Sequence, residues 1–188
     1  MRRSRTPCVL ALCAAVLAGC GTSGSPDGPA DEATTQAAQS TRDLGRKVVA
    51  FDPCRDVPDD VISRAGYDPA SRETSEYPMS GYTFLGCDFE TPVRQYGLSL
   101  LSGNITFAEE KKKTEAFAEP MEINGRPALL ELDPAERDSC AISLETDYGV
   151  LIVLRGLHHD YIGPAPREEW CAGLEDTARL IEPLLADG

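Results

Sequence analysis

The residues of this chain that most clearly could do chemistry are its seven cysteines. Three fall within the first twenty residues, and four lie far apart in the remainder: Cys54, Cys87, Cys140 and Cys171. An even number of widely spaced cysteines predicts two disulfides in an exported protein. Zinc binding is the competing interpretation, but no two of the four have the Cys-x-x-Cys spacing of a zinc knuckle. Four cysteines allow three pairings, and the count alone does not choose among them.

The only histidines form the run His158-His159-Asp160, which is the obvious candidate for metal binding. Adjacent side chains on a strand point to opposite faces, and two histidines on a loop rarely hold an ion without a distant third ligand. We therefore interpret the run as a polar loop between the last strand and the last helix. The sequence predicts no metal site and no cofactor.

Other catalytic patterns are missing from the sequence. The predicted domain has no Gly-x-Ser-x-Gly nucleophile elbow and no glycine-rich phosphate loop. The 31 acidic residues offer many carboxylate pairs, and this abundance makes no single pair informative. We therefore assign no catalytic residue and expect the protein not to be an enzyme, with an unrecognised envelope hydrolase as the alternative.

A different chemistry is indicated at Cys20, the last residue of the run Leu17-Ala18-Gly19-Cys20. Arginines at positions 2, 3 and 5 precede an apolar stretch over 8–18, which is too short for a membrane span but typical of an export signal. The run resembles the lipobox of bacterial lipoproteins. The resemblance implies that residues 1–19 are removed and that Cys20 carries a diacylglyceryl thioether with acyl chains such as palmitate. It places the protein on the outer, extracytoplasmic face of the cell membrane. An uncleaved anchor and an ordinary secretory signal are the alternatives.

The charge of the chain narrows the choice of partners. The 18 basic and 31 acidic residues give a formal net charge of -13, which becomes about -16 if residues 1–19 are removed. Such an acidic protein lacks the basic surface that nucleic acid requires. It is also repelled by anionic lipid, so the acyl chains must supply the membrane attachment. Lys111–Lys113 form the one basic cluster of the domain, which we interpret as an exposed helix face rather than a site for an anionic envelope component.

Residues 20–46 are predicted to form a disordered tether after the lipidated cysteine. From Gly21 to Asp43 there is no Val, Ile, Leu, Met, Phe, Tyr or Trp. Such a segment cannot bury enough apolar surface to offset the entropy of ordering. A tether of this composition has a reach of roughly 25–30 Å. Residues 47–188 follow as a single domain, whose length suits one hydrophobic core.

Hydrophobic periodicity predicts three helices in this domain. We expect a short helix between Asp56, its N-cap, and Gly66, just after its end. A second helix is expected from Thr106 to Ala118, with Thr106 and Glu109 forming a capping box. The third covers about 167–186 and has the clearest apolar face, which Trp170 opens.

Alternating patterns predict strands over 82–90 and 96–101. Two hairpins follow, one turning at Asn124-Gly125 and one at 147–149, and the polar stretch 70–77 is expected to be a loop. The predicted fold class is α+β, an antiparallel sheet packed with N- and C-terminal helices and stapled by disulfides. Since Cys87 and Cys140 fall in predicted strands and Cys54 and Cys171 at helix starts, we expect the pairs Cys87–Cys140 and Cys54–Cys171.

Several short runs around the cysteines carry a family resemblance. They are FDPC at 51–54, ISRAGYDP at 62–69, GYTFLGC at 81–87, CAI at 140–142 and CAGL at 171–174. Together they resemble the actinobacterial lipoproteins grouped as domain of unknown function 3558, over essentially the whole domain. The resemblance implies a cell-envelope protein of unassigned activity and supplies no catalytic residues. The chain is also similar to the α/β/α sandwich of the Mog1/PsbP type.

The expected role is therefore binding without catalysis. We expect the domain to bind a small or lipidic envelope ligand, or a partner protein, through the sheet face or the region Tyr77–Tyr82. A ligand carrier requires an apolar cavity, whereas a docking module requires an exposed apolar patch. We interpret Trp170, the only tryptophan, as part of the core rather than as a platform for a ligand.

Overall fold

The computed structural model describes residues 45–79, 81–136, 138–158, 160–163 and 167–185. The predicted signal peptide (residues 1–19), the lipidation residue Cys20 and almost all of the predicted tether lie outside the described residues, as does His159. No helix in the described part of the chain is long and apolar enough to cross a membrane.

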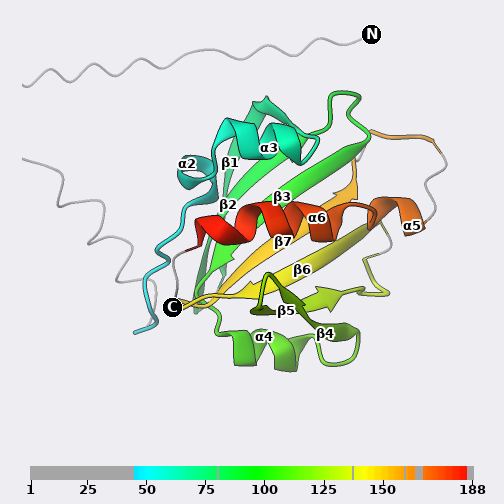
Figure 1. Ribbon diagram of the computed structural model, residues 1–188. Helices are drawn as coiled ribbons and strands as arrows, with labels where there is room; N and C mark the ends of the chain where they lie inside the picture. Colours follow the sequence, from blue (N-terminus) through cyan, green and yellow to red (C-terminus); the bar gives the residue numbers. More distant parts are fainter. Residues whose placement is uncertain (1–44, 80, 137, 159, 164–166, 186–188) are drawn as a thin grey trace, which may run out of the picture. The chain divides into compact units, whose positions relative to one another are not determined.

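The domain is built on one sheet of seven strands in which every neighbouring pair is antiparallel. In sheet order the strands are β1 (Asp68–Met79), β2 (Tyr82–Glu90), β3 (Tyr96–Gly103), β7 (Val150–Leu157), β6 (Ser139–Glu145), β5 (Arg126–Glu131) and β4 (Ala118–Ile123). Strands that follow each other in the chain pair as hairpins, and the pairing of β3 with β7 joins the two sets (Figure 1). The predicted α+β class with an antiparallel sheet is confirmed.

Most of the helices lie on one face of this sheet. In Figure 1, α6 (Leu174–Ile181) crosses in front of the strands, with α2 (Pro53–Asp56) and α3 (Asp59–Arg64) beside it. The short helices α5 (Arg167–Trp170) and η1 (Glu182–Leu184) flank α6 in the chain. The remaining helix, α4 (Phe107–Lys113), lies at the bottom of this view, beyond β5 and β4.

The main hydrophobic core fills the space between the sheet and α3 and α6. Its fully buried side chains include Ile62, Leu98, Leu100, Leu144, Leu151 and Ile181. A smaller cluster lies on the opposite face and includes Phe84, Ile105, Ala141, Val150 and Ile152, with Phe107 of α4 packed against it. The central strand β7 therefore buries side chains on both faces, which explains its continuous apolar run.

Local signals in the sequence place several elements correctly. The β4–β5 hairpin turns at Asn124 and Gly125, which have φ values of 52° and 91°, as a tight two-residue turn requires. Helix α4 begins at the predicted capping box, in which the Thr106 side chain accepts from the Glu109 N–H and the Glu109 carboxylate accepts from the Thr106 N–H. The predicted helix ends earlier than expected, at Lys113.

The stretch 70–77 was wrongly predicted to be a loop, because it belongs to the edge strand β1. An edge strand pairs on one side only, so its side chains need not alternate between apolar and polar. Ser71 anchors its irregular start by accepting from the Glu90 N–H at 2.8 Å, and regular pairing with β2 then begins at Glu73. The strand β1 therefore forms because its backbone hydrogen-bonds to β2, and not because of a hydrophobic pattern in its own sequence.

The expected continuous helix over 167–186 is instead broken into α5, α6 and η1. Gly173 interrupts it with a left-handed backbone (φ 77°), and Pro183 limits the last turn because proline lacks an N–H. The first helix also differs from prediction in its cap. Pro58 occupies the N-cap position of α3, and the Asp56 carboxylate instead accepts from the Asp52 N–H at 2.8 Å.

Two disulfides are present as predicted, but the predicted pairing was wrong. Cys54 pairs with Cys87, at a Cα–Cα distance of 4.9 Å, and Cys140 pairs with Cys171, at 5.7 Å. The expected Cys87–Cys140 bridge is impossible because β3 and β7 lie between the strands that carry these residues. Three strand spacings amount to about 14 Å, twice the reach of a disulfide.

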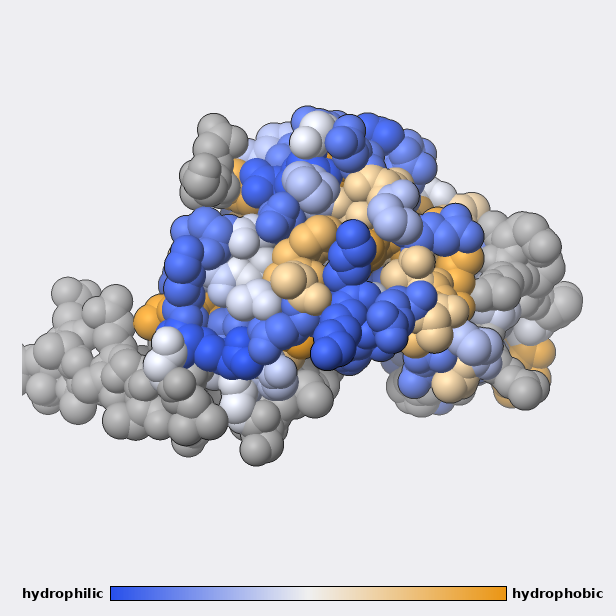
Figure 2. All heavy atoms as spheres, turned by 90° about the horizontal axis from the view of Figure 1, so that it is seen from below, coloured by the Kyte–Doolittle hydropathy of each residue, from blue (hydrophilic) through white to orange (hydrophobic). Residues whose placement is uncertain are grey.

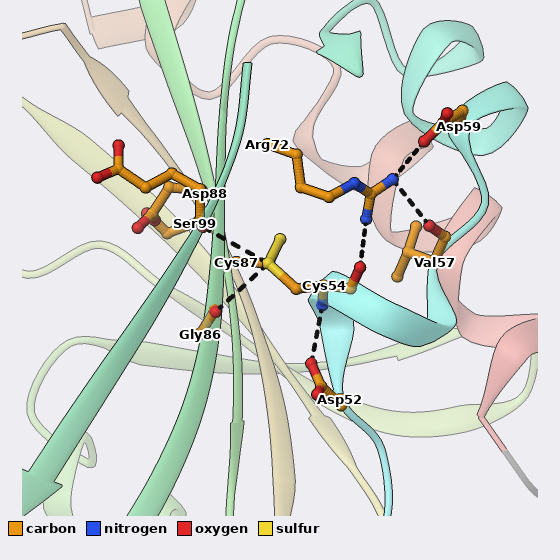
Figure 3. The surroundings of a disulfide bond; sticks show 10 residues. Asp52, Cys54, Val57, Asp59, Arg72, Gly86, Cys87, Asp88 and Ser99 are labelled. Atoms are coloured by element: carbon orange, nitrogen blue, oxygen red, sulfur yellow. Dashed lines mark hydrogen bonds and ion pairs between the residues drawn. A yellow bond between two sulfur atoms is a disulfide. The ribbon is translucent and has the colours of Figure 1, made fainter. Parts of the chain in front are cut away.

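Figure 3 shows how the first bridge is positioned. The Asp52 carboxylate caps α2 by accepting from the Cys54 N–H at 3.0 Å. The Arg72 guanidinium donates to the carbonyl oxygens of Cys54 and Val57, and pairs with the Asp59 carboxylate. These contacts tie the α2–α3 corner to the strands β1 and β2.

Candidate binding site

His158, the described histidine of the predicted loop, closes one end of the sheet just after β7. Its Nε2 lies 2.9 Å from Oε1 of Glu90 at the end of β2, and its Nδ1 lies 3.2 Å from the Asp160 N–H. Nε2 also lies 3.1 Å from Nη2 of Arg94. Arg94 pairs with the same carboxylate at 2.9 Å. The described residues contain no group of His, Cys, Asp or Glu arranged to hold a metal ion.

A second polar cluster lies beneath α4. The Ser143 hydroxyl donates to the Glu131 carboxylate at 2.5 Å, and Lys113 pairs with Glu110 at 3.0 Å. Ser143 is fully buried and Glu110 is 1 % exposed, and both are already paired within the fold. Burial raises the pKa of Glu131, the Ser143 hydrogen bond opposes this rise, and the nearby Glu110 adds to it. The Ser143–Glu131 bond joins β6 to β5 and the Lys113–Glu110 pair lies within α4, so both pairs are satisfied inside the fold.

Replacing Glu131 with glutamine is expected to raise the free energy of unfolding at pH 7. Glutamine keeps an acceptor for Ser143 but removes a charge whose burial is unfavourable, since the pKa of Glu131 in the folded state is raised. The gain is present above that raised pKa and disappears as the pH falls below the ordinary pKa of glutamate, where the wild-type carboxyl is protonated. Urea unfolding across pH 4–8 measures this difference. The matched change at exposed Glu136 should alter neither stability nor its pH dependence.

A groove of about 370 Å³ lies where the described chain enters the domain. Arg46 crosses it, makes a bidentate ion pair with Glu109 at 2.8 Å and stacks over the ring of Tyr82, 4.3 Å from its centre. The Arg46 hydrogen bond is the main reason why the pKa of Glu109 is lowered to about 2. The groove therefore holds an arginine that is already neutralised by the fold.

Arg155, in β7, differs from the other described arginines. Arg155 makes no ion pair within the described chain, and its Nε is buried without a hydrogen-bond partner. Every other arginine whose side chain is described is paired with an acidic residue: Arg46, Arg55, Arg64, Arg72, Arg94, Arg126 and Arg179. The chain has 31 acidic residues, yet none that is described pairs with this half-buried guanidinium. Arg155 is therefore a candidate group for binding an anion.

The surroundings of Arg155 come from four separate segments. Arg155 lies opposite Leu98 of β3 and Cys140 of β6, on the face that carries the main core. Its guanidinium stacks on the Tyr96 ring, 4.2 Å from the centre. Nη1 lies 3.6 Å from the point that a Cβ on Gly173 would occupy, at the start of α6. Cys140 lies beside Arg155 and is bonded to Cys171. The disulfide therefore keeps the segment around Gly173, at the start of α6, close to the arginine.

The hydroxyl of Tyr67, which follows α3, completes the cluster. Tyr67 is 3 % exposed, and no described residue accepts a hydrogen bond from its hydroxyl. Burial raises the pKa of Tyr67, and the positive charge of the neighbouring Arg155, together with a hydrogen bond from its side chain, opposes that rise. We call Arg155, Tyr67, Tyr96 and Gly173 the Arg155 site. It can bind a negatively charged or hydrogen-bond-accepting group.

The residues singled out in the sequence lie elsewhere. Lys111 and Lys112 are exposed in the last turn of α4, and Trp170 is half-buried at the end of α5. Tyr82, from the predicted binding region, packs against the smaller hydrophobic cluster. Sequence reasoning missed the Arg155 site, although one signal was available. A single charge directly follows the apolar run 150–154 and lies in register with its inward-facing residues.

Few large hydrophobic side chains are strongly exposed in the described part of the chain. The exposed large hydrophobic residues of the described chain are Val48, Val93 and Ile162. Figure 2, seen from the end where α4 lies in Figure 1, shows hydrophobic residues surrounded by many hydrophilic ones. A polar binding site is therefore better defined in this structure than an apolar docking surface.

Comparison with known proteins adds one finding. A family model described as "Protein of unknown function (DUF3558)" matches residues 15–184. No curated protein and no solved structure matches the chain.

Proposed function

Since the chain belongs to the protein family of unknown function DUF3558, we propose its function from its own residues: it is a lipoprotein of the outer face of the cell membrane whose domain binds a ligand without catalysis. The observation that carries this proposal is the unpaired Arg155 beside the unpartnered hydroxyl of Tyr67. The ligand is a small or lipidic molecule of the envelope, or an exposed group of a partner protein.

Binding is favoured over catalysis by the kind of group that is left unsatisfied. The acid–base candidates are engaged with each other, His158 with Glu90 and Ser143 with Glu131. A guanidinium keeps its proton throughout the physiological pH range, so Arg155 cannot transfer protons as a general acid or base. It can, however, hold an anion in a fixed orientation. These groups support a binding site and offer no nucleophile for an envelope hydrolase.

The membrane anchor is proposed from the lipobox. Replacing Cys20 with alanine is expected to abolish incorporation of an alkyne-tagged palmitate into the protein, because the acceptor thiol is lost. The matched control is Cys13→Ala, which removes a cysteine from the apolar stretch and should leave labelling intact. Gel fluorescence after coupling to a dye measures the incorporation. Equal labelling of the wild type and Cys20→Ala would contradict lipidation at this residue.

Ligand binding is tested on the mature protein extracted from its host membrane in mild detergent. Native mass spectrometry should show an extra mass that disappears on denaturation, and Arg155→Gln should carry much less of it. A bound polypeptide instead of a small molecule would identify the partner-protein form of the proposal. A wild-type protein that is always free of added mass, alone and after incubation with envelope extract, would contradict ligand binding.

A further inference from the structure

We infer that the Arg155 site binds a singly charged carboxylate of the ligand, held by the Arg155 guanidinium, the Tyr67 hydroxyl and the first turn of α6. The inference rests on the proposed binding function and names the chemical group that the site recognises.

The first argument is that the positive charge of Arg155 has no acidic partner among the described residues. Seven other arginines of the described chain find an acidic partner within it, and several of these are far more exposed. For comparison, Arg126 pairs with Glu182 at 2.8 Å, and both side chains are mostly buried. A half-buried guanidinium costs free energy unless an anion offsets its lost hydration. The described residues supply no such anion at Arg155, and we assign this role to a ligand.

The second argument is the convergence of two unused donors. The buried Nε–H of Arg155 has no acceptor, and neither does the proton of the Tyr67 hydroxyl, whose oxygen lies close to the Arg155 side chain. Buried donors are nearly always satisfied in folded proteins, and two neighbouring exceptions indicate a shared acceptor. The stacking of Tyr96 covers one face of the guanidinium, so an acceptor must approach along its edge. The edge is where arginine binds carboxylates, through two parallel N–H bonds.

The third argument comes from helix α6. Its N-cap is Gly173, which has no side chain to accept from the first N–H groups of the helix. Arg155 therefore lies beside the positive end of a helix, where a second positive charge is unfavourable and an anion is stabilised. The first turn carries two acidic residues, Asp176 and Glu175, and Glu175 pairs with Arg179. An anion between Arg155 and α6 would satisfy both positive elements at once.

The single positive charge of the site favours a ligand group with one negative charge. The site offers one full positive charge, and the chain as a whole is strongly acidic. A phosphate dianion would leave a net negative charge in a half-buried position, whereas a carboxylate is neutralised by Arg155 alone. A planar carboxylate also matches the edge of the guanidinium. The ligand is therefore expected to carry a carboxylate rather than a phosphate.

The inference is tested by proton–nitrogen NMR of the arginine Nε–H groups in the mature protein in detergent micelles. The probe is sodium acetate, compared with inorganic phosphate at equal ionic strength. We expect the Arg155 Nε–H signal, assigned by its loss in Arg155→Lys, to shift saturably with acetate. The Nε–H signal of Arg126, already paired with Glu182, should stay in place in the same spectra.

The variant Tyr67→Phe adds a second measurement. It removes one donor, so the apparent Kd for acetate should rise about fivefold, while Tyr96 still stacks on Arg155. A shift with phosphate but not acetate would overturn the carboxylate assignment, and no shift with either would overturn the site. If the Arg155 Nε–H signal shifts with neither anion while native mass spectrometry finds a bound ligand, the proposed site is wrong but the proposed binding function stands. If Arg155 binds acetate while no envelope ligand is ever found, the site stands and the proposed function is wrong.

Discussion

Removing the Cys140–Cys171 bridge by a double change to serine is expected to lower the free energy of unfolding by about 3–4 kcal/mol. The bridge joins residues 31 positions apart, and without it the unfolded chain regains the entropy of an open loop. Both cysteines lie in or against the main core, so the serine hydroxyls add a small penalty of burial. Urea unfolding of wild type and variant, each in oxidising buffer, measures the loss.

The other bridge provides a matched control. Cys54 and Cys87 are 33 positions apart, so the corresponding double serine variant should lose about the same stability. Only the Cys140–Cys171 variant should weaken acetate binding at Arg155, because only that bridge holds the Gly173 corner against the arginine. Equal binding in the two variants would contradict the positioning role of Cys140–Cys171. Peptide mapping without reduction checks the pairing independently.

Replacing Leu144 with alanine is expected to cost 2–5 kcal/mol, about the range seen when a large buried aliphatic side chain is truncated. Leu144 is fully buried in β6, opposite Leu151 of β7 and Ala128 of β5. The small neighbour Ala128 cannot fill the space, so a cavity remains. Chemical denaturation measures the change.

The exposed position Val93 is the control for this substitution. Its side chain is 78 % exposed, so Val93→Ala should change stability by less than about 0.5 kcal/mol. Similar losses at Leu144 and Val93 would show that β6 is not central to the core.

Local chemistry made parts of the fold predictable. Asn124-Gly125 specifies a tight turn because both residues tolerate positive φ, and Thr106 with Glu109 specifies a helix start through reciprocal hydrogen bonds. The alternation of 82–90 predicted β2 because Cys87 and Phe89 recur on the face of that strand that lines the main core. Each of these signals depends on residues close together in the chain.

Features that depend on distant residues were missed. β1 is a strand because β2 supplies its hydrogen-bond partners, and its own polar sequence gives no sign of this. The terminal helix breaks at Gly173, beside the Cys140–Cys171 bridge, and that bridge could be predicted only from the strand order. The pairing failed for the same reason, since two predicted strands were assumed to be neighbours.

The Arg155 site could not be predicted from the sequence either. Tyr67, Tyr96, Arg155 and Gly173 belong to four segments and share no spacing pattern. What distinguishes Arg155 is the lack of an acidic partner, and partners are defined only after folding. In contrast, the sequence motifs that drew attention, such as His158, are engaged within the fold.

The central claim is that Arg155 binds a ligand's carboxylate. The most direct measurement is a high-resolution crystal structure of the mature protein, purified without carboxylate buffers after incubation with envelope extract. We expect planar density that is not part of the chain and lies within hydrogen-bond distance of Arg155 Nε and the Tyr67 hydroxyl. A carboxylate of the chain itself paired with Arg155, or ordered water alone between the two donors, would contradict the claim.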